Sequence, residues 1–148
     1  MAEFSFSTPD FEDGGEIPKK FGYKFENFEP KIRIDGGPDG TVSAALIMDD
    51  PDAMKAVGKV WVHWLMCNML LPEHEDEADL STIYGKTDFG ETKYGGPAPP
   101  DGKHTYVFKA YAIDTFLDLK EGFSKQELED AMKGHILAEA KLTGTFAT

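Results

Sequence analysis

Four side chains able to bind or exchange a proton lie in two separate segments, each rich in aromatic and turn-forming residues. Asp50 and His63 belong to the first segment, and His104 and Tyr106 belong to the second. Imidazole rings, a carboxylate and a phenol together can bind a small anion and exchange protons with it. The combination of these polar side chains with aromatic and turn-forming residues in both segments predicts a small site for an anion or phosphate-like group, built from histidines and backbone amides.

Each of these residues also has an ordinary structural interpretation. Asp50 precedes Pro51 at the expected end of a strand, where a carboxylate commonly accepts backbone N–H groups. His63 lies between two tryptophans, as a satisfied core histidine would. His104 begins a strand after a Gly- and Pro-rich loop, with Tyr106 on the same face. Two histidines from distant segments, with an aspartate that can accept an imidazole N–H, favour the site.

The loop before His104 is suited to hold an anion through its backbone. Gly96 permits a close approach of amide groups, while Pro97, Pro99 and Pro100 fix the chain in one shape. Either Pro99 or Pro100 is a candidate for a cis peptide bond. Backbone amides matter here because Arg33 is the only arginine of the chain, which nearly excludes an arginine clamp.

Two other kinds of site stay open. His63, His104 and Asp50 could act as acid and base in a hydrolase, but the sequence contains no Gly-x-Ser-x-Gly motif. Cys67 lies inside an apolar run, where a thiol is usually inert. Two histidines and an aspartate also suit zinc or iron, although they lack close ligand spacing. We expect a binding protein with no catalytic residue, metal or cofactor.

Composition indicates one globular domain over residues 1–148, since 41% of the residues are hydrophobic and 12% are aromatic. The net charge of -12 opposes binding to nucleic acid. No apolar run reaches the ~20 residues that span a bilayer, and the first residues do not resemble a signal peptide. With a single cysteine, the sequence favours the cytoplasm. The aromatic surplus predicts an apolar patch that supports a homodimer.

The apolar pattern predicts mainly strands in the first two thirds of the chain. A short strand around Phe6 is followed by strands over 31–34 and 41–48, which the turn over 35–40 should join as an antiparallel pair. Residues 49–58 read as a loop. Residues 60–70 predict a central strand in which alternation places His63 and Leu65 on one face.

The last part of the chain predicts an acidic surface loop, a long ordered loop, a strand and a helix. The acidic loop covers residues 73–79, the ordered loop 80–100 and the strand 104–114. The helix follows Ser124, because Ser124 and Glu127 fit a capping box. An apolar stripe extends the expected helix through Ile136 towards Gly144, with a short edge strand over 145–147.

Several of these motifs, in this order, resemble the phosphatidylethanolamine-binding protein family, most closely its short bacterial and archaeal branch. They are Asp50-Pro51-Asp52-Ala53, the histidine within a Trp-rich strand, Asp88-Phe89-Gly90 and the run from Tyr94 to Tyr106. The family resemblance implies antiparallel sheets packed as a sandwich and a surface cavity for phosphate, acetate or phosphorylated head groups. Carried over by motif, the cavity would be lined by Asp50, His63, His104 and Tyr106, with Trp61, Gly96 and Pro97 as its walls.

The same resemblance implies a role in binding and not in catalysis. Relatives include the Raf kinase inhibitor protein and plant flowering regulators, so modulation of a partner protein is part of the expectation, although the sequence names no partner. Two positions depart from the family pattern: Met54 stands where proline is frequent, and Thr105 stands where eukaryotic members commonly place arginine. A lipid tail or a kinase partner is therefore not carried over.

Overall fold

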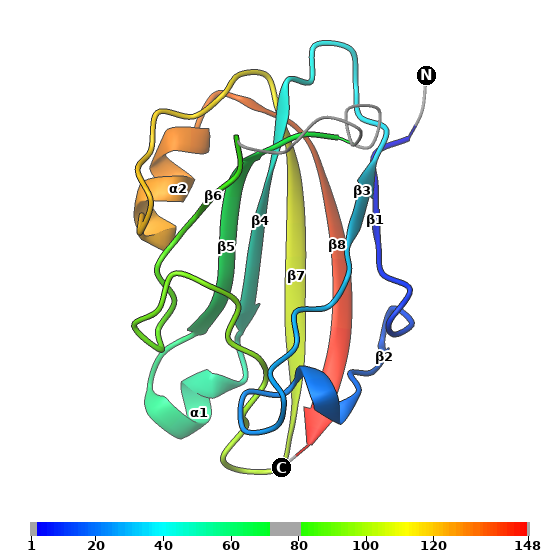
Figure 1. Ribbon diagram of the computed structural model, residues 1–148, viewed down its shortest axis with the longest axis vertical. Coiled ribbons are helices and arrows are strands. Elements are labelled where there is room, and N and C mark those ends of the chain that lie inside the picture. Colours follow the sequence, from blue (N-terminus) through cyan, green and yellow to red (C-terminus); the bar gives the residue numbers. More distant parts are fainter. Residues whose placement is uncertain (1–2, 72–80, 148) are drawn as a thin grey trace.

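The computed structural model describes residues 3–71 and 81–147, and its centre is a six-stranded sheet (Figure 1). The strand order is β2 (Gly15–Glu16), β8 (Ile136–Ala147), β7 (Lys103–Ile113), β4 (Ser43–Asp50), β5 (Trp61–Met69) and β6 (Ile83–Tyr84). All neighbours are antiparallel except β2 and β8. A second antiparallel sheet pairs β1 (Ser5–Ser7) with β3 (Arg33–Asp35). The expectation of a mainly β fold of packed sheets is confirmed.

Short helices complete the structure: η1 (Lys19–Phe21), α1 (Ala53–Val57) and α2 (Lys125–Met132). Figure 1 shows α2 and the β1–β3 pair at opposite margins of the main sheet, and each covers its own apolar core. Phe6 and Ile34 pack on one face, whereas Leu128 and Met132 pack on the other. None of the helices within the described ranges is long and apolar enough to cross a membrane.

The predicted strand over 41–48 is confirmed as β4, but its predicted partner is wrong. Ile34 of β3 lies opposite Phe6 of β1, and β4 lies between β5 and β7. Every residue of β4 is buried, so this strand needs a partner on each side and a layer on each face. Residues 35–42 cross from one sheet to the other instead of forming a hairpin, with Gly36 and Gly37 at positive φ.

A bulge in β5 changes which side chains share a face. Met48 and Asp49 are consecutive in β4, yet they lie opposite Trp64 and Val62, so His63 is an extra residue in β5. The simple alternation expected from the sequence is therefore wrong beyond this point. His63 contacts Tyr106 on the same side of the sheet as the core that contains Trp64. Its neighbour Leu65 belongs to the opposite core.

The central strand is β4 and not β5, because β5 has only the two-residue β6 on its outer side. Residues 49–58, expected as a loop, instead continue β4 to Asp50 and then form α1. The acidic segment over 73–79 lies outside the described residues.

The capping box of α2 is confirmed: Ser124 accepts from the Glu127 amide, and the Glu127 carboxylate accepts from the Ser124 amide. The predicted extension of this helix is wrong. It ends at Met132, Gly134 takes φ +81°, and residues from Ile136 form β8. The expected edge strand over 145–147 is the end of β8, which lies between β7 and β2.

The Gly- and Pro-rich loop is fixed against the segment that follows η1. The Gly96 amide donates to the Asn27 side chain at 2.8 Å, and the Tyr23 amide donates to the Pro97 carbonyl at 3.0 Å. A Cβ atom at Gly96 would lie 1.9 Å from the Phe21 carbonyl oxygen. The described peptide bonds are all trans, including those of the prolines proposed as cis candidates. Glycine is therefore required here by close backbone approach.

Replacing this glycine tests the packing. We expect Gly96→Ala to lower the free energy of unfolding by about 3 kcal/mol or more, because the backbone of one of the two segments must move. Gly90→Ala is the matched control: its Cβ atom would have open space, and the positive φ alone costs about 1–2 kcal/mol. Urea unfolding of both variants would show equal losses if the close approach were unimportant.

Candidate functional site

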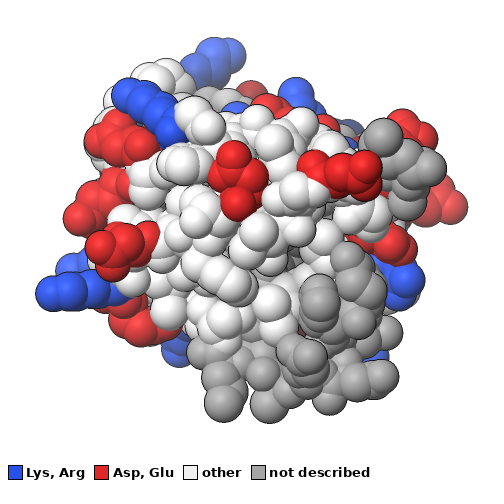
Figure 2. All heavy atoms as spheres, turned by 90° about the horizontal axis from the view of Figure 1, so that it is seen from above, with Lys and Arg blue, Asp and Glu red and all other residues white. Residues whose placement is uncertain are grey.

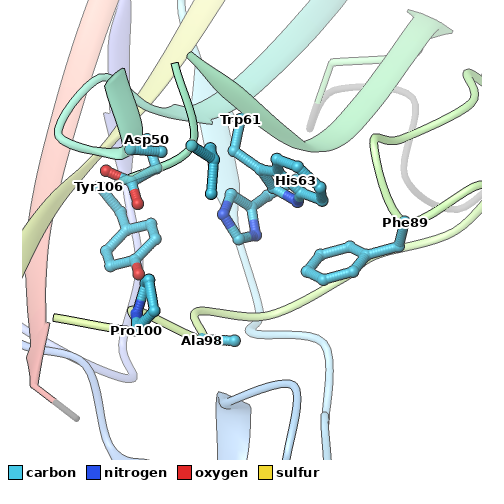
Figure 3. Close-up of a pocket in the computed structure, with 9 residues that line it drawn as sticks. Asp50, Trp61, His63, Phe89, Ala98, Pro100 and Tyr106 are labelled. Atoms are coloured by element: carbon cyan, nitrogen blue, oxygen red, sulfur yellow. The ribbon is translucent and has the colours of Figure 1, made fainter. Parts of the chain in front are cut away.

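A cavity of about 230 Å³ lies where β4 ends and where α1 and β5 begin (Figure 3). Its wall combines an acidic end with a larger apolar surface. The lining residues are Asp50, Ala53, Val57, Trp61, His63, Phe89, Ala98, Pro100 and Tyr106. Strands, α1 and the ordered loop thus each contribute, which explains why no short sequence segment contains the whole site.

The apolar part of the wall is held by stacked rings. Phe89 lies parallel to Tyr23, with ring centroids 3.9 Å apart, and meets the edges of Trp61 and His63. Figure 3 shows the His63 ring between Phe89 on one side and Asp50 and Tyr106 on the other. Because the Phe89 and Tyr106 rings both pack against His63, the His63 side chain has little freedom to rotate.

His63 has one ring nitrogen committed to the protein. Its Nδ1 lies 2.6 Å from the Gly95 carbonyl oxygen, to which it donates. Burial lowers the pKa of His63 despite the opposing effects of the Gly95 and Gly96 carbonyls and of Asp50 and Asp49. The neutral ring therefore carries its proton on Nδ1 and leaves Nε2 as a hydrogen-bond acceptor at the cavity that His63 lines.

His104 joins two carboxylates. Its Nδ1 lies 2.6 Å from Asp50 Oδ2, and its Nε2 lies 2.5 Å from Asp101 Oδ1. Burial by itself would lower the pKa of His104, but hydrogen bonds to Asp50 and Asp101 and their charges outweigh it and raise that pKa. Both ring nitrogens can donate only in the imidazolium form, so the cluster is a carboxylate–imidazolium–carboxylate chain with a net charge of one negative unit, buried at Asp50 and His104 and exposed at Asp101.

Asp50 also orders the chain behind it. Its second oxygen, Oδ1, accepts from the Asp52 amide at 2.9 Å, and Asp52 in turn accepts from the Thr105 amide at 2.8 Å. The two interpretations offered for Asp50, a turn carboxylate and an acceptor for imidazole, therefore both hold. The start of β7 is tied to the end of β4 through these contacts.

Tyr106 contributes a hydroxyl that lies near the Asp50 carboxylate and the Ala98 backbone but meets no described residue in ordinary hydrogen-bond geometry. The residue is fully buried, and the hydroxyl forms no hydrogen bond of ordinary geometry. Burial, together with the charge of Asp50, raises the pKa of Tyr106, so the phenol keeps its proton. An unpaired buried hydroxyl costs roughly 1–3 kcal/mol, which a bound acceptor would recover.

No lysine or arginine lines this cavity in the described part of the chain. Lys59 lies over the Trp61 ring at the rim, 5.8 Å from its centroid, but it pairs with Asp88 at 2.7 Å. Lys125 pairs with Asp49 at 3.0 Å. Among the described residues, no group of three or more acidic, histidine or cysteine side chains is arranged to hold a metal ion.

The structure brings together most of the side chains singled out by sequence. Asp50, Trp61, His63 and Tyr106 line one cavity. His104 does not line it, because this ring lies between Asp50 and Asp101 and is 3% exposed.

Gly96 and Pro97, which we expected to form a wall of the cavity, do not line it. Ala98 and Pro100 of the same loop line it instead. Sequence reasoning missed the α1 residues and Asp101. It quoted Phe89 only as part of a motif. An acidic residue three positions before a histidine was the available signal for Asp101, but it is too common to be specific.

Two side chains left without a role are placed elsewhere. Cys67 is fully buried in the core on the opposite face, and burial, with a smaller effect of Glu121, raises its pKa to about 12. His135 is on the surface and pairs with Asp114 at 2.7 Å. His74 lies outside the described residues.

Comparison with known proteins gives the same architecture over the whole chain. A UPF0098 protein from Methanothermobacter thermautotrophicus is 41% identical and aligns with 96% of this chain and 97% of its own length. A crystal structure described as a phosphatidylethanolamine-binding protein homologue from Chlamydia trachomatis matches with a TM-score of 0.86 at 33% identity, covering 100% and 99% of the two chains. YbcL of E. coli, described as a new member of the mammalian family, matches with a TM-score of 0.84 at 26% identity over 99% of each chain.

The family model described as phosphatidylethanolamine-binding protein matches residues 7–147. This range contains the whole six-stranded sheet, the loop and every residue of the cavity. The chain therefore belongs to the phosphatidylethanolamine-binding protein family.

Proposed function

We propose that this chain is a non-catalytic binding protein whose cavity captures a small ligand through an oxyanion or phosphorylated head group. Family membership supports a binding role. The observation that carries the proposal is the cavity itself, in which a carboxylate, an imidazole acceptor and an unpaired phenol lie beside an apolar wall. Ligand sites commonly combine a mostly apolar surface with a few convergent polar groups.

The two histidines have different tasks in this proposal. His63 contacts the ligand through Nε2, since its other nitrogen is held by Gly95. His104 is a structural cation that holds Asp50 in place and cancels part of its charge. His104 is thus the histidine whose N–H Asp50 accepts, and its charge is shared between two carboxylates and not directed into the cavity.

The hydrolase alternative lacks a nucleophile. Tyr106 is the only lining residue with a hydroxyl, and its raised pKa keeps the oxygen protonated. Cys67 lies on the other face of the sheet. For the metal-dependent alternative, His104 is not available because both of its ring nitrogens are hydrogen-bonded to carboxylates. His63 and Asp50 then remain as the two potential metal ligands among the side chains that line the cavity, fewer than the three protein ligands of a typical catalytic zinc site.

Histidine resonances test the binding proposal directly. On titration with methyl phosphate we expect the largest NMR shift at His63, a smaller one at His104 through Asp50, and none at His135 on the surface. His63→Phe should weaken binding by about tenfold or more, the loss of one good hydrogen bond. His135→Phe is the control that should leave the affinity unchanged. An unmoved His63 signal with phosphate, acetate and phosphoethanolamine would contradict the proposal.

Stability separates the roles of the two histidines. We expect His104→Ala to cost about 3–5 kcal/mol, because the buried Asp50 carboxylate then loses its charged partner, while Asp101 is 47% exposed and can be solvated by water. His63→Ala should cost less, since it removes one hydrogen bond to a carbonyl. Chemical unfolding of both variants at pH 6 measures this difference in unfolding free energy. Equal losses of stability would contradict the assignment of a structural role to His104 and a ligand-binding role to His63.

The pH dependence of the His104 contribution has a definite sign. Because the folded state raises the pKa of His104, its ion pairs stabilise the fold fully below the unfolded value of about 6.5. This stabilisation is lost as the pH rises through the folded pKa. The difference in unfolding free energy between the unmodified chain and His104→Ala should therefore be greatest near pH 6 and shrink by pH 10. A difference that grew with pH would contradict the imidazolium assignment.

A homodimer, modulation of a partner protein and a cytoplasmic location also belong to the proposal. Figure 2 shows the end of the molecule far from the cavity, where uncharged surface occupies the centre and acidic side chains lie mostly towards the margin. At this end the exposed apolar side chains are Val42 just before β4, Phe116 in the segment after β7, and Ile136 and Leu137 at the start of β8. An apolar surface of this kind favours self-association.

Self-association predicts a simple response to substitution. Phe116→Ser should lower the dimer fraction in sedimentation velocity at micromolar concentration, because this ring is 49% exposed at the apolar end. Phe28→Ser is the matched control, since Phe28 is similarly exposed in the segment that follows η1. A monomer at every concentration would contradict this part of the proposal and leave the binding role intact.

A further inference from the structure

We propose that the cavity prefers a phosphate monoester, bound in its singly protonated form, over a phosphodiester. This inference rests on the binding function proposed above and adds the chemical class of the head group. Its basis is the balance of hydrogen-bond donors and acceptors that the lining residues present, together with the absence of a free cation among them.

The resting cavity offers acceptors at its polar end. His63 Nε2 is an acceptor because Nδ1 holds the proton that is donated to Gly95. Asp50 has one partner on each oxygen, His104 on Oδ2 and Asp52 on Oδ1, so it retains accepting capacity. The donors among the lining side chains are the Tyr106 hydroxyl and the Trp61 indole N–H. A ligand that brings its own acidic hydrogen therefore matches this end of the cavity.

The charges around His63 oppose a fully ionised ligand. On β4, Asp50 lines the cavity with His63, whereas Asp49 acts on His63 only through its charge and is paired with Lys125. On β7, Tyr106 contacts His63 and stacks in turn on the His104 ring. The positive charge of His104 is balanced by its two carboxylates. The loop contributes the Gly95 and Gly96 carbonyls and the Phe89 ring, which carry no charge.

A dianion entering this cavity would meet carboxylate charge without a compensating cation.

A phosphate monoester can satisfy these constraints and a phosphodiester cannot. The second pKa of a monoester is about 6, so the singly protonated form keeps a P–OH group near neutral pH. That group can donate to His63 Nε2 while another phosphate oxygen accepts from the Tyr106 hydroxyl. A phosphodiester has lost its single acidic hydrogen at neutral pH, so it leaves His63 Nε2 unpaired unless the ring takes up a proton against the effect of burial.

Paired model esters test this preference. Calorimetric titration would compare methyl phosphate with dimethyl phosphate, and phosphoethanolamine with glycerophosphoethanolamine, from pH 5.5 to 8.5 in two buffers of different ionisation enthalpy. We expect each monoester to bind at least about tenfold more tightly than its diester, the value of one buried hydrogen bond. Above pH 6 the apparent Kd of the monoester should rise about tenfold per pH unit, with uptake of about one proton on binding. Phosphatidylethanolamine vesicles, whose head group is a diester, should bind no better than the free diester.

Two variants locate the effect. His63→Phe keeps a ring in the wall but removes the acceptor, so monoester and diester should then bind equally weakly. His135→Phe should leave both affinities and the proton uptake unchanged. Equal affinity for the two esters of the unmodified chain, or monoester binding without proton uptake, would overturn the preference while leaving the binding function in place. Failure of every ester to bind at any pH would overturn the binding function itself.

Discussion

The pairing of Asp50 with His104 is the interaction on which the rest of the site depends. It joins the last residue of β4 to the second residue of β7, two strands that are neighbours in the main sheet. A charge pair this deeply buried is stable only when every polar atom has a partner, and Asp101 and the Asp52 amide supply the remaining ones. Because His104 is occupied in this way, His63 and Tyr106 are the residues that present an imidazole and a hydroxyl to the cavity.

The sequence predicts well the elements that are decided by local pattern, and poorly those decided by tertiary context. β4, β7 and the start of α2 follow from an apolar run, an alternating run and a capping box. The end of α2 was missed because the stripe through Ile136 continues with helical spacing, while Gly134 at positive φ ends the helix and pairing with β7 extends the strand. The partner of β3 depends on which layer the chain enters after residue 35, which no local pattern specifies.

The same division applies to the site. That Asp50, His63 and Tyr106 are neighbours could be predicted from the order of the family motifs that contain them. The place of His104 behind Asp50 could not, because a ring that lines a cavity and a ring that supports it have the same sequence surroundings. Phe89 and Pro100 reach the cavity through the path of a long loop, which depends on backbone contacts with the segment after η1.

The extra residue in β5, His63, lies between the part of the strand that lines the cavity and the part that packs in the hydrophobic core. Trp61 before the bulge and His63 within it line the cavity, whereas Trp64 beyond it packs in the core under the β1–β3 pair. The bulge also returns the strand to the pairing with β4 that the core needs. One inserted residue thus sets which side chains of β5 belong to the wall of the cavity and which belong to the hydrophobic interior.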